Sequence, residues 1–161
     1  MAKRIDVATL PVITGTTYPA PYDEPCRERR RVRLGDMAGL TQYGVNLLTL
    51  APGAWSSQRH WHTGGDEFIY VLAGEVVLVS DAGEEVLRAG DCAGFKAGDP
   101  DGHHLKNRSG ADTTILEIGT RAPGEAAYYP GIDLVAQVAS PAKPGGYTHT
   151  DGTPYPAVGR R

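Results

Sequence analysis

The chain has 161 residues, 40% of them hydrophobic, and its formal net charge is −3. This length suits one domain with a sizeable core. The mild acidity argues against nucleic acid as a partner, because phosphate binding usually leaves a basic footprint. No stretch approaches the ~20 apolar residues that a membrane-spanning helix needs, so we expect no membrane partner. The N-terminal stretch lacks the continuous apolar run of a signal peptide, and we therefore expect a cytoplasmic protein.

An arginine-rich run precedes the apolar middle of the chain. Residues 26–33 read CRERRRVR, so five of these eight residues are arginine. We interpret the run as a solvated edge segment whose cations pair with acidic groups elsewhere. The alternative is an anion-binding site.

Short apolar stretches separated by turn residues then recur at a spacing of roughly ten residues, which is typical of an all-β sandwich or barrel. The predicted strands cover residues 43–50, 54–62, 67–73, 75–80, 84–89, 92–95, 103–107 and 113–119. Ile69 and Val71 should face the interior of the barrel, since they alternate along one strand. Gly53, Gly74 and Gly90 end such stretches, and we interpret them as turn glycines with positive φ.

The segments on either side of these strands differ from them in character. We treat residues 1–161 as a single domain with a barrel core at about 43–119, an N-terminal segment at 1–42 and a C-terminal arm at 120–161. The arm is rich in proline and tyrosine, and we expect it to lie over the barrel or over a neighbouring subunit. Because the edge strands of a sheet need covering, we expect the flanking segments to cover them across a homodimer.

Two histidines and a glutamate stand where the predicted strand 54–62 gives way to the next one. Alternate side chains of a strand share a face, so His60 and His62 project the same way and Gln58 shares their face. The TGGD turn then reverses the chain and returns Glu67 beside them. Neutral imidazole and ionised carboxylate are usual ligands of divalent transition metals. We therefore predict a metal site here, with Gln58 as a candidate substrate-binding residue.

A fourth ligand should come from another strand, and the candidates are the adjacent histidines His103 and His104. If His103 faces inward, a leucine and an asparagine follow it by alternation; if His104 does, a lysine and an arginine follow. Burying two unpaired cations costs far more than burying a leucine and an asparagine. We therefore choose His103 and expect His104 on the outer face or at the rim.

These residues resemble the cupin superfamily, whose two motifs read G, H-x-H, E, G and then G, P-x-G, H-x3-N. The matching positions of the first motif are Gly53, His60, His62, Glu67 and Gly74, and those of the second are Gly90, Lys96, Gly98, His103 and Asn107. Lys96 replaces the usual proline, and the loop before His103 is two residues longer. The resemblance spans residues 43–119. It implies a double-stranded β-helix, a jelly-roll barrel of two antiparallel sheets, with His60, His62, Glu67 and His103 as the metal ligands.

The resemblance also implies a range of chemistry. Four protein ligands leave positions open on an octahedral ion, as in catalytic rather than closed structural sites. We therefore expect a small oxygen-bearing substrate and one divalent transition metal, with iron, manganese, zinc and nickel left open. The simplest expectation is a dioxygenase-type enzyme. The alternatives are a non-redox isomerase or lyase, acting on a sugar phosphate if the arginine run folds over the barrel mouth, and a binding protein without turnover.

Overall fold

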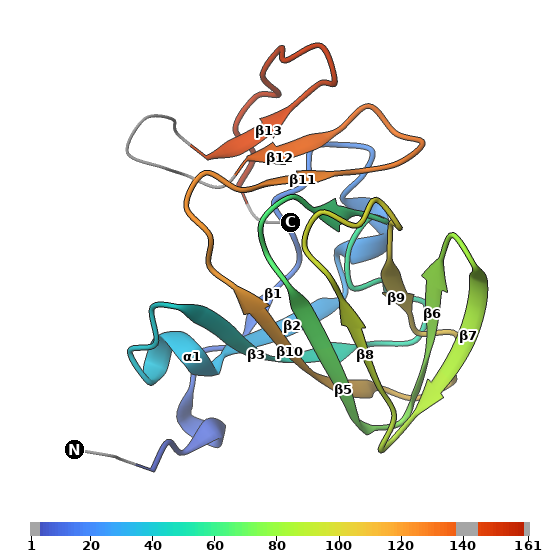
Figure 1. Ribbon diagram of the computed structural model, residues 1–161. Coiled ribbons are helices and arrows are strands. Elements are labelled where there is room, and N and C mark those ends of the chain that lie inside the picture. The colour runs from blue at the N-terminus through green and yellow to red at the C-terminus, as the bar shows by residue number, and fades with distance from the viewer. Residues whose placement is uncertain (1–3, 138–144, 160–161) are drawn as a thin grey trace.

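The computed structural model describes residues 4–137 and 145–159, and its regular structure is almost entirely β-strand (Figure 1). The strands are β1 (Ile13–Thr14), β2 (Arg29–Arg33), β3 (Tyr43–Leu50), β4 (Trp61–His62), β5 (Glu67–Ala73), β6 (Glu75–Ser80), β7 (Gly83–Arg88), β8 (Cys92–Phe95), β9 (His104–Lys106), β10 (Thr113–Thr120), β11 (Ala126–Tyr128), β12 (Val135–Gln137) and β13 (Gly146–Thr148). The helical segments are η1 (Val7–Thr9), η2 (Glu24–Cys26) and α1 (Leu34–Met37). Among the described residues, no helix has the length and apolar character needed to cross a membrane.

One wall of the barrel is a six-stranded antiparallel sheet in the order β1-β2-β3-β10-β5-β8. Its longest ladder joins β10 to β3 over eight residue pairs. The inward side chains at one end of this wall are apolar and belong to the main core, which includes Leu48, Ile69, Val71 and Ile115. Ile69 and Val71 therefore face the interior, as predicted. Toward the other end, the inward positions of β5 and β10 carry carboxylates, which leaves that end available for a polar site.

The opposite wall consists of two ladders, β7-β6-β9 and β13-β12-β11-β4. Two isolated antiparallel bridges, Trp55↔Lys106 and His60↔His103, connect them. The architecture confirms the predicted all-β jelly-roll barrel, and in the described part of the chain these bridges join the two ladders of its second sheet.

Most of the predicted strands are observed, and four have the predicted bounds: 43–50, 67–73, 75–80 and 92–95. The predicted strand at 54–62 is reduced to β4. The reason is that its main-chain groups bond to different partners: Trp55 N–H donates to the carbonyl oxygen of Pro25, and Ser56 N–H to that of Leu105. Alternation is therefore interrupted between Trp55 and His60.

Three predicted turn glycines have positive φ, as expected: Gly53 at 84°, Gly74 at 79° and Gly90 at 100°. Gly74 is also sterically confined, because a Cβ there would lie 3.0 Å from the carbonyl oxygen of Asp112. A side chain at this position would strain the turn between β5 and β6.

The arginine-rich run forms a strand within the six-stranded sheet, so its interpretation as a solvated edge segment is only partly right. β2 pairs with β1 on one side and with β3 on the other. Pairing with acids is observed, since Arg30 contacts Asp112 on the outer side and Arg31 bonds to Glu117 on the inner side. The strand's alternation turns Arg29 and Arg31 into the barrel, and this alternation is why the run is not simply solvated.

The C-terminal arm packs against its own barrel, which is one of the two positions expected for it (Figure 1). β11 pairs with β4, with Ala127 opposite His62 and Tyr128 opposite Trp61. A second apolar cluster joins the arm to the N-terminal segment and contains Tyr18, Cys26, Ala127, Tyr129 and Leu134. Residues 138–144 of the arm lie outside the described residues. The homodimer stays a prediction.

Leu48→Ala should destabilise the barrel by about 3 kcal/mol, because it removes a fully buried side chain and leaves a cavity in the main core. Leu72→Ala is the matched control, since Leu72 lies on β5 with its side chain exposed to solvent. We expect that change to cost less than about 1 kcal/mol. Equilibrium urea denaturation measures both effects, and equal losses for the two variants would contradict the assignment of the core.

Candidate metal centre

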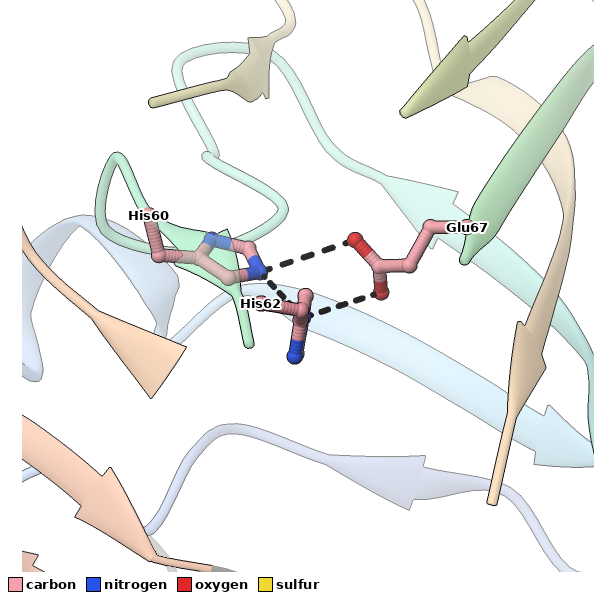
Figure 2. A group of neighbouring side chains, drawn as sticks. All are labelled: His60, His62 and Glu67. Atoms are coloured by element: carbon pink, nitrogen blue, oxygen red, sulfur yellow. Dashed lines mark hydrogen bonds and ion pairs between the residues drawn. The ribbon is translucent and has the colours of Figure 1, made fainter. Parts of the chain in front are cut away.

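His60 lies in the irregular segment that leads into β4, and His62 is the last residue of β4; their rings meet inside the barrel (Figure 2). Nε2 of His60 lies 3.1 Å from Nε2 of His62. Nδ1 of His60 lies 2.9 Å from the main-chain carbonyl oxygen of Gln58, to which it donates. This bond fixes the tautomer, so Nε2 of His60 carries the lone pair that a metal ligand needs.

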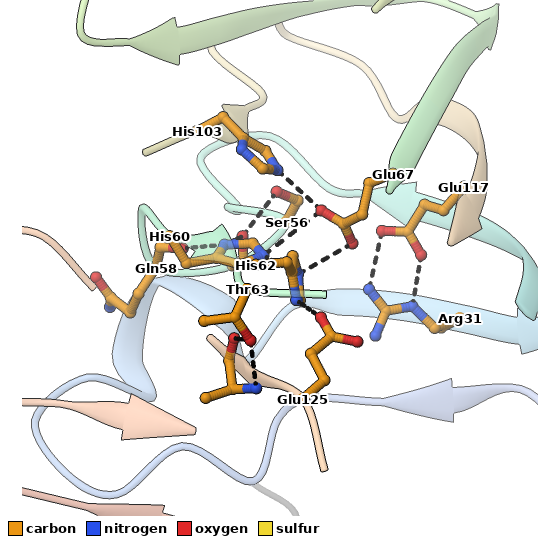
Figure 3. A network of polar contacts seen from close by, with 12 residues as sticks. Arg31, Ser56, Gln58, His60, His62, Thr63, Glu67, His103, Glu117 and Glu125 are labelled. Atoms are coloured by element: carbon orange, nitrogen blue, oxygen red, sulfur yellow. Dashed lines mark hydrogen bonds and ion pairs between the residues drawn. The ribbon is translucent and has the colours of Figure 1, made fainter. Parts of the chain in front are cut away.

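Glu67, the first residue of β5, faces the two histidines and also meets His103 (Figure 3). Its Oε2 lies 2.8 Å from Nε2 of His103 and 3.7 Å from Nε2 of His60, and its Oε1 lies 3.4 Å from Nε2 of His62. The ring of Phe95 stacks on that of His103 with 3.5 Å between the centroids, which holds the imidazole in place. The structure thus brings His60 and His62 beside Glu67, and His103 contacts the same carboxylate.

This donor set fits a divalent metal ion. One ligand atom from each of His60, His62 and Glu67 can be chosen so that all lie within 4.8 Å of one another. Two nitrogen ligands at right angles, each about 2.1 Å from one ion, would be about 3.0 Å apart. The two Nε2 atoms are 3.1 Å apart. His103 lies outside this group of three, although its Nε2 is 2.8 Å from the same carboxylate.

His104 lies away from the carboxylate, and it is not at an exposed rim. Its ring packs edge-on against Trp55 with 4.8 Å between the centroids, and Nδ1 lies 3.0 Å from the carbonyl oxygen of Ser57. Only 4% of His104 is exposed. His104 thus lies on the side of β9 opposite the core residue Leu105, as expected, but it is buried there because the irregular 54–60 segment folds over this side.

Gln58, the predicted substrate-binding residue, occupies a different place. Its Nε2 donates to the carbonyl oxygen of Tyr22 at 2.7 Å, and the residue is not among those that line the cavity beside the histidines. Figure 3 shows its side chain pointing away from Glu67. The prediction rested on strand alternation, which does not hold between Trp55 and His60. Gln58 instead attaches the N-terminal segment to the barrel.

Glu125 is a site residue that the sequence analysis did not identify. Its carboxylate contacts Nδ1 of His62, on the ring edge opposite Glu67, and its side chain is 5% exposed. Gly65 leaves room for it, since a Cβ at that position would lie 2.8 Å from both carboxylate oxygens. Glu125 precedes β11 and reaches His62 only because β11 pairs with β4. No local pattern signals this long-range pairing.

Burial and neighbouring charges set the protonation of the metal-free cluster. Burial lowers the pKa of His60 to about 4, so its ring is neutral. Burial also lowers the pKa of His62, but hydrogen bonds to Glu125 and Glu67 outweigh this effect and raise it to about 10. Burial raises the pKa of Glu67, yet hydrogen bonds from His103 and His62 hold it well below its ordinary value. A metal ion would therefore displace a proton from His62.

The cluster lines a cavity of about 250 Å³, and a second cavity of about 520 Å³ shares part of its lining. Both cavities are bordered by Arg31, Glu67, Glu117 and Ile118. In the inner cavity the hydroxyl-bearing residues Tyr18, Ser57 and Tyr147 face the same space as the histidines. The site can therefore take a small polar molecule that also reaches an arginine.

Comparisons with known proteins agree with this architecture. A family model described as a cupin domain matches residues 46–119. A crystal structure described as a cupin-superfamily sugar phosphate isomerase from Silicibacter pomeroyi is 42% identical, with a TM-score of 0.89. That match covers 96% of this chain and 98% of the other.

Two more distant structures show the fold alone. One, from Acidithiobacillus ferrooxidans, is 22% identical with a TM-score of 0.74, and the match covers 91% of each chain. The polyketide cyclase RemF from Streptomyces resistomycificus is 20% identical with a TM-score of 0.61, covering 74% of this chain and 80% of the other. No curated protein matches the chain.

His62→Ala and His103→Ala should each weaken metal retention at least ~10-fold, because each removes an imidazole that points at the Glu67 carboxylate. His104→Ala should keep the metal, since its ring is turned toward Trp55. Elemental analysis after dialysis against a weak chelator measures the three variants together. Unchanged metal content in His62→Ala would remove that residue from the ligand set.

The stability gained on metal loading should grow as the pH rises from about 6.5 toward 10. The pKa of His62 is raised from 6.5 to about 10 in the folded metal-free protein, so its proton contributes stability below pH 6.5 that is lost by about pH 10. Metal binding displaces this proton, so the metal-loaded protein does not lose this stability as the pH rises. The stability difference between the metal-loaded and the metal-free protein therefore increases over the same pH interval. Melting temperatures of metal-loaded and metal-free protein measure the difference.

Glu125→Gln is the control for this pH dependence, because it removes the charge that faces Nδ1 of His62 and keeps the shape of the side chain. The growth of the melting-temperature difference with pH should be smaller in this variant. If the melting-temperature difference between metal-loaded and metal-free parent protein stays constant with pH, the assignment of His62 as the group that loses a proton to the metal is contradicted.

Proposed function

This chain belongs to the cupin superfamily, and we propose that it is a metal-dependent isomerase acting on a small phosphorylated sugar. The observation that carries the proposal is the meeting, in one cavity, of the His–His–Glu cluster and the arginine-bearing strand β2. The relative from Silicibacter pomeroyi, described as a sugar phosphate isomerase, supports the same class of reaction, since the match extends over nearly the whole of both chains.

We propose that His60, His62, Glu67 and His103 together hold one divalent transition metal, either iron, manganese, zinc or nickel. When bound, the ion supplies a Lewis acid that polarises a carbonyl oxygen and its neighbouring hydroxyl. Nε2 of His60 faces the carboxylate in the tautomer needed for coordination, because Nδ1 donates to the Gln58 carbonyl. Glu125 orients His62 from the other side through its contact with Nδ1.

The remaining residues of the cavity bind and orient the substrate. The hydroxyl groups of Tyr18, Ser57 and Tyr147 can exchange hydrogen bonds with sugar hydroxyls. Phe95 supplies an apolar surface beside His103, which keeps water away from the ring face. The inner cavity has a volume of about 250 Å³, which suits a molecule of about monosaccharide size.

A direct assay follows from this proposal. Protein purified without tag or chelator is first analysed for metal, and phosphorylated aldoses and ketoses are then supplied singly in D₂O. We expect aldose–ketose interconversion with deuterium entering the carbon next to the carbonyl, and no oxygen consumption. His103→Ala should lose at least ~100-fold in kcat/KM, since it removes a proposed ligand.

The same assay decides between this proposal and the two other functions expected from the sequence. Oxygen uptake coupled to substrate loss would favour a dioxygenase-type enzyme. Tight retention of a sugar phosphate without turnover, in metal-loaded protein, would favour a binding protein. Either result would overturn the isomerase proposal.

A further inference from the structure

Arg31 stands at the boundary between the two cavities. It projects inward from β2 and bonds to Glu117 through two parallel contacts, Nε to Oε2 at 2.8 Å and Nη2 to Oε1 at 2.9 Å. These contacts use one edge of the guanidinium. The other nitrogen, Nη1, has no hydrogen-bond partner in the ranges that the structure describes, and Figure 3 shows it pointing away from Glu117. The end of the fork formed by Nη1 and Nη2 is thus available for an anion.

The other arginines of β2 are committed elsewhere. Arg29 is buried, and its guanidinium bonds to the carbonyl oxygens of Gly15 and Ser56 and to the hydroxyl of Thr16. Arg30 lies on the opposite face of β2 and contacts Asp112. Arg33 lies at the outer cavity, where Asp36 is 3.5 Å from its Nη1. Arg31 is therefore the arginine of β2 that combines a free edge with access to the histidine cluster.

Glu117 holds Arg31 in this position. Glu117 lies on β10 opposite Ile69, and Gly119, two residues along, lies opposite Glu67. Residues two apart in a strand share a face, so Glu117 and Glu67 both point into the barrel. The bidentate pair holds the guanidinium in one plane before any anion binds. The side chain of Arg31 therefore loses less conformational entropy when an anion binds to it.

We propose that the Nη1–Nη2 edge of Arg31 binds the phosphate of the substrate, while the carbonyl end of the same molecule reaches the histidine cluster. This inference rests on the proposed function for the identity of the anion. Glu117 acts as a positioning residue. A guanidinium edge offers two parallel donors to two phosphate oxygens, a geometry that lysine cannot reproduce.

Inorganic phosphate is the probe for this subsite, titrated calorimetrically into metal-loaded protein. Arg31→Met should raise the Kd for phosphate at least ~10-fold, and Arg31→Lys should also weaken binding, because it keeps the charge and loses the fork. Arg30→Met is the matched control, since it removes a cation from the same strand on the outer face. Its Kd should equal that of the parent.

Loss of Arg31 leaves Glu117 half-buried without its partner, so the single variant has a folding risk. The double variant Arg31→Met with Glu117→Leu removes both charges, and such replacement is often neutral for stability. It should retain metal and still fail to bind phosphate. Phosphate binding that survives in a folded, metal-loaded double variant would overturn the proposal, as would equal weakening in Arg30→Met.

The test separates this inference from the proposed function. Phosphate binding that depends on Arg31 supports the subsite even if no sugar phosphate is turned over. Conversely, isomerase activity with an unchanged KM in Arg31→Met would leave the function standing and would overturn the subsite. Acetate is titrated in parallel, and Arg31-dependent binding of acetate without binding of phosphate would show a carboxylate site and contradict the proposal.

Discussion

The site depends on a single carboxylate placed inside the barrel. An ionised carboxylate removed from water is unfavourable unless charges or donors surround it. Glu67 meets this requirement through the nitrogens of His62 and His103, with His60 close by. Because these imidazoles come from two different segments, the arrangement exists only when the 54–62 segment and the 103–107 segment lie side by side. The bridge His60↔His103 provides that contact.

The same ladder that builds the core also sets the position of the site. Along the inner face of β10 and β5, apolar side chains such as Ile115 and Val71 give way to Glu117 and Glu67. Alternation permits no other arrangement, since the register that buries the leucine and isoleucine side chains also turns the glutamates inward. A change of register by one residue would expose the core and remove the carboxylates from the cavity together.

The segments outside the barrel core complete the centre. From the arm, Glu125 contacts the outer nitrogen of His62, and the absence of a side chain at Gly65 makes room for it. From the N-terminal segment, β2 brings Arg31 into the barrel. Neither group belongs to the apolar cluster of the main core. Their common effect is to add charge on two sides of the cluster, so the flanking segments contribute to the chemistry as well as covering sheet edges.

The amino-acid sequence by itself determined the all-β barrel, the bounds of four strands, the interior positions of Ile69 and Val71, and the choice of His103 over its neighbour His104. These features follow from local alternation and from the penalty on burying unpaired cations, both of which can be read along one strand. Only the tertiary structure decided the positions of Gln58, His104, Glu125 and Arg31. Each depends on contacts between segments distant in the chain. The N-terminal segment bonds to the 54–58 stretch and interrupts its alternation, β11 carries Glu125 to β4, and β2 enters the sheet beside β3. Local periodicity carries no information about which distant strand becomes a neighbour, and this choice of neighbours fixed the rest of the site.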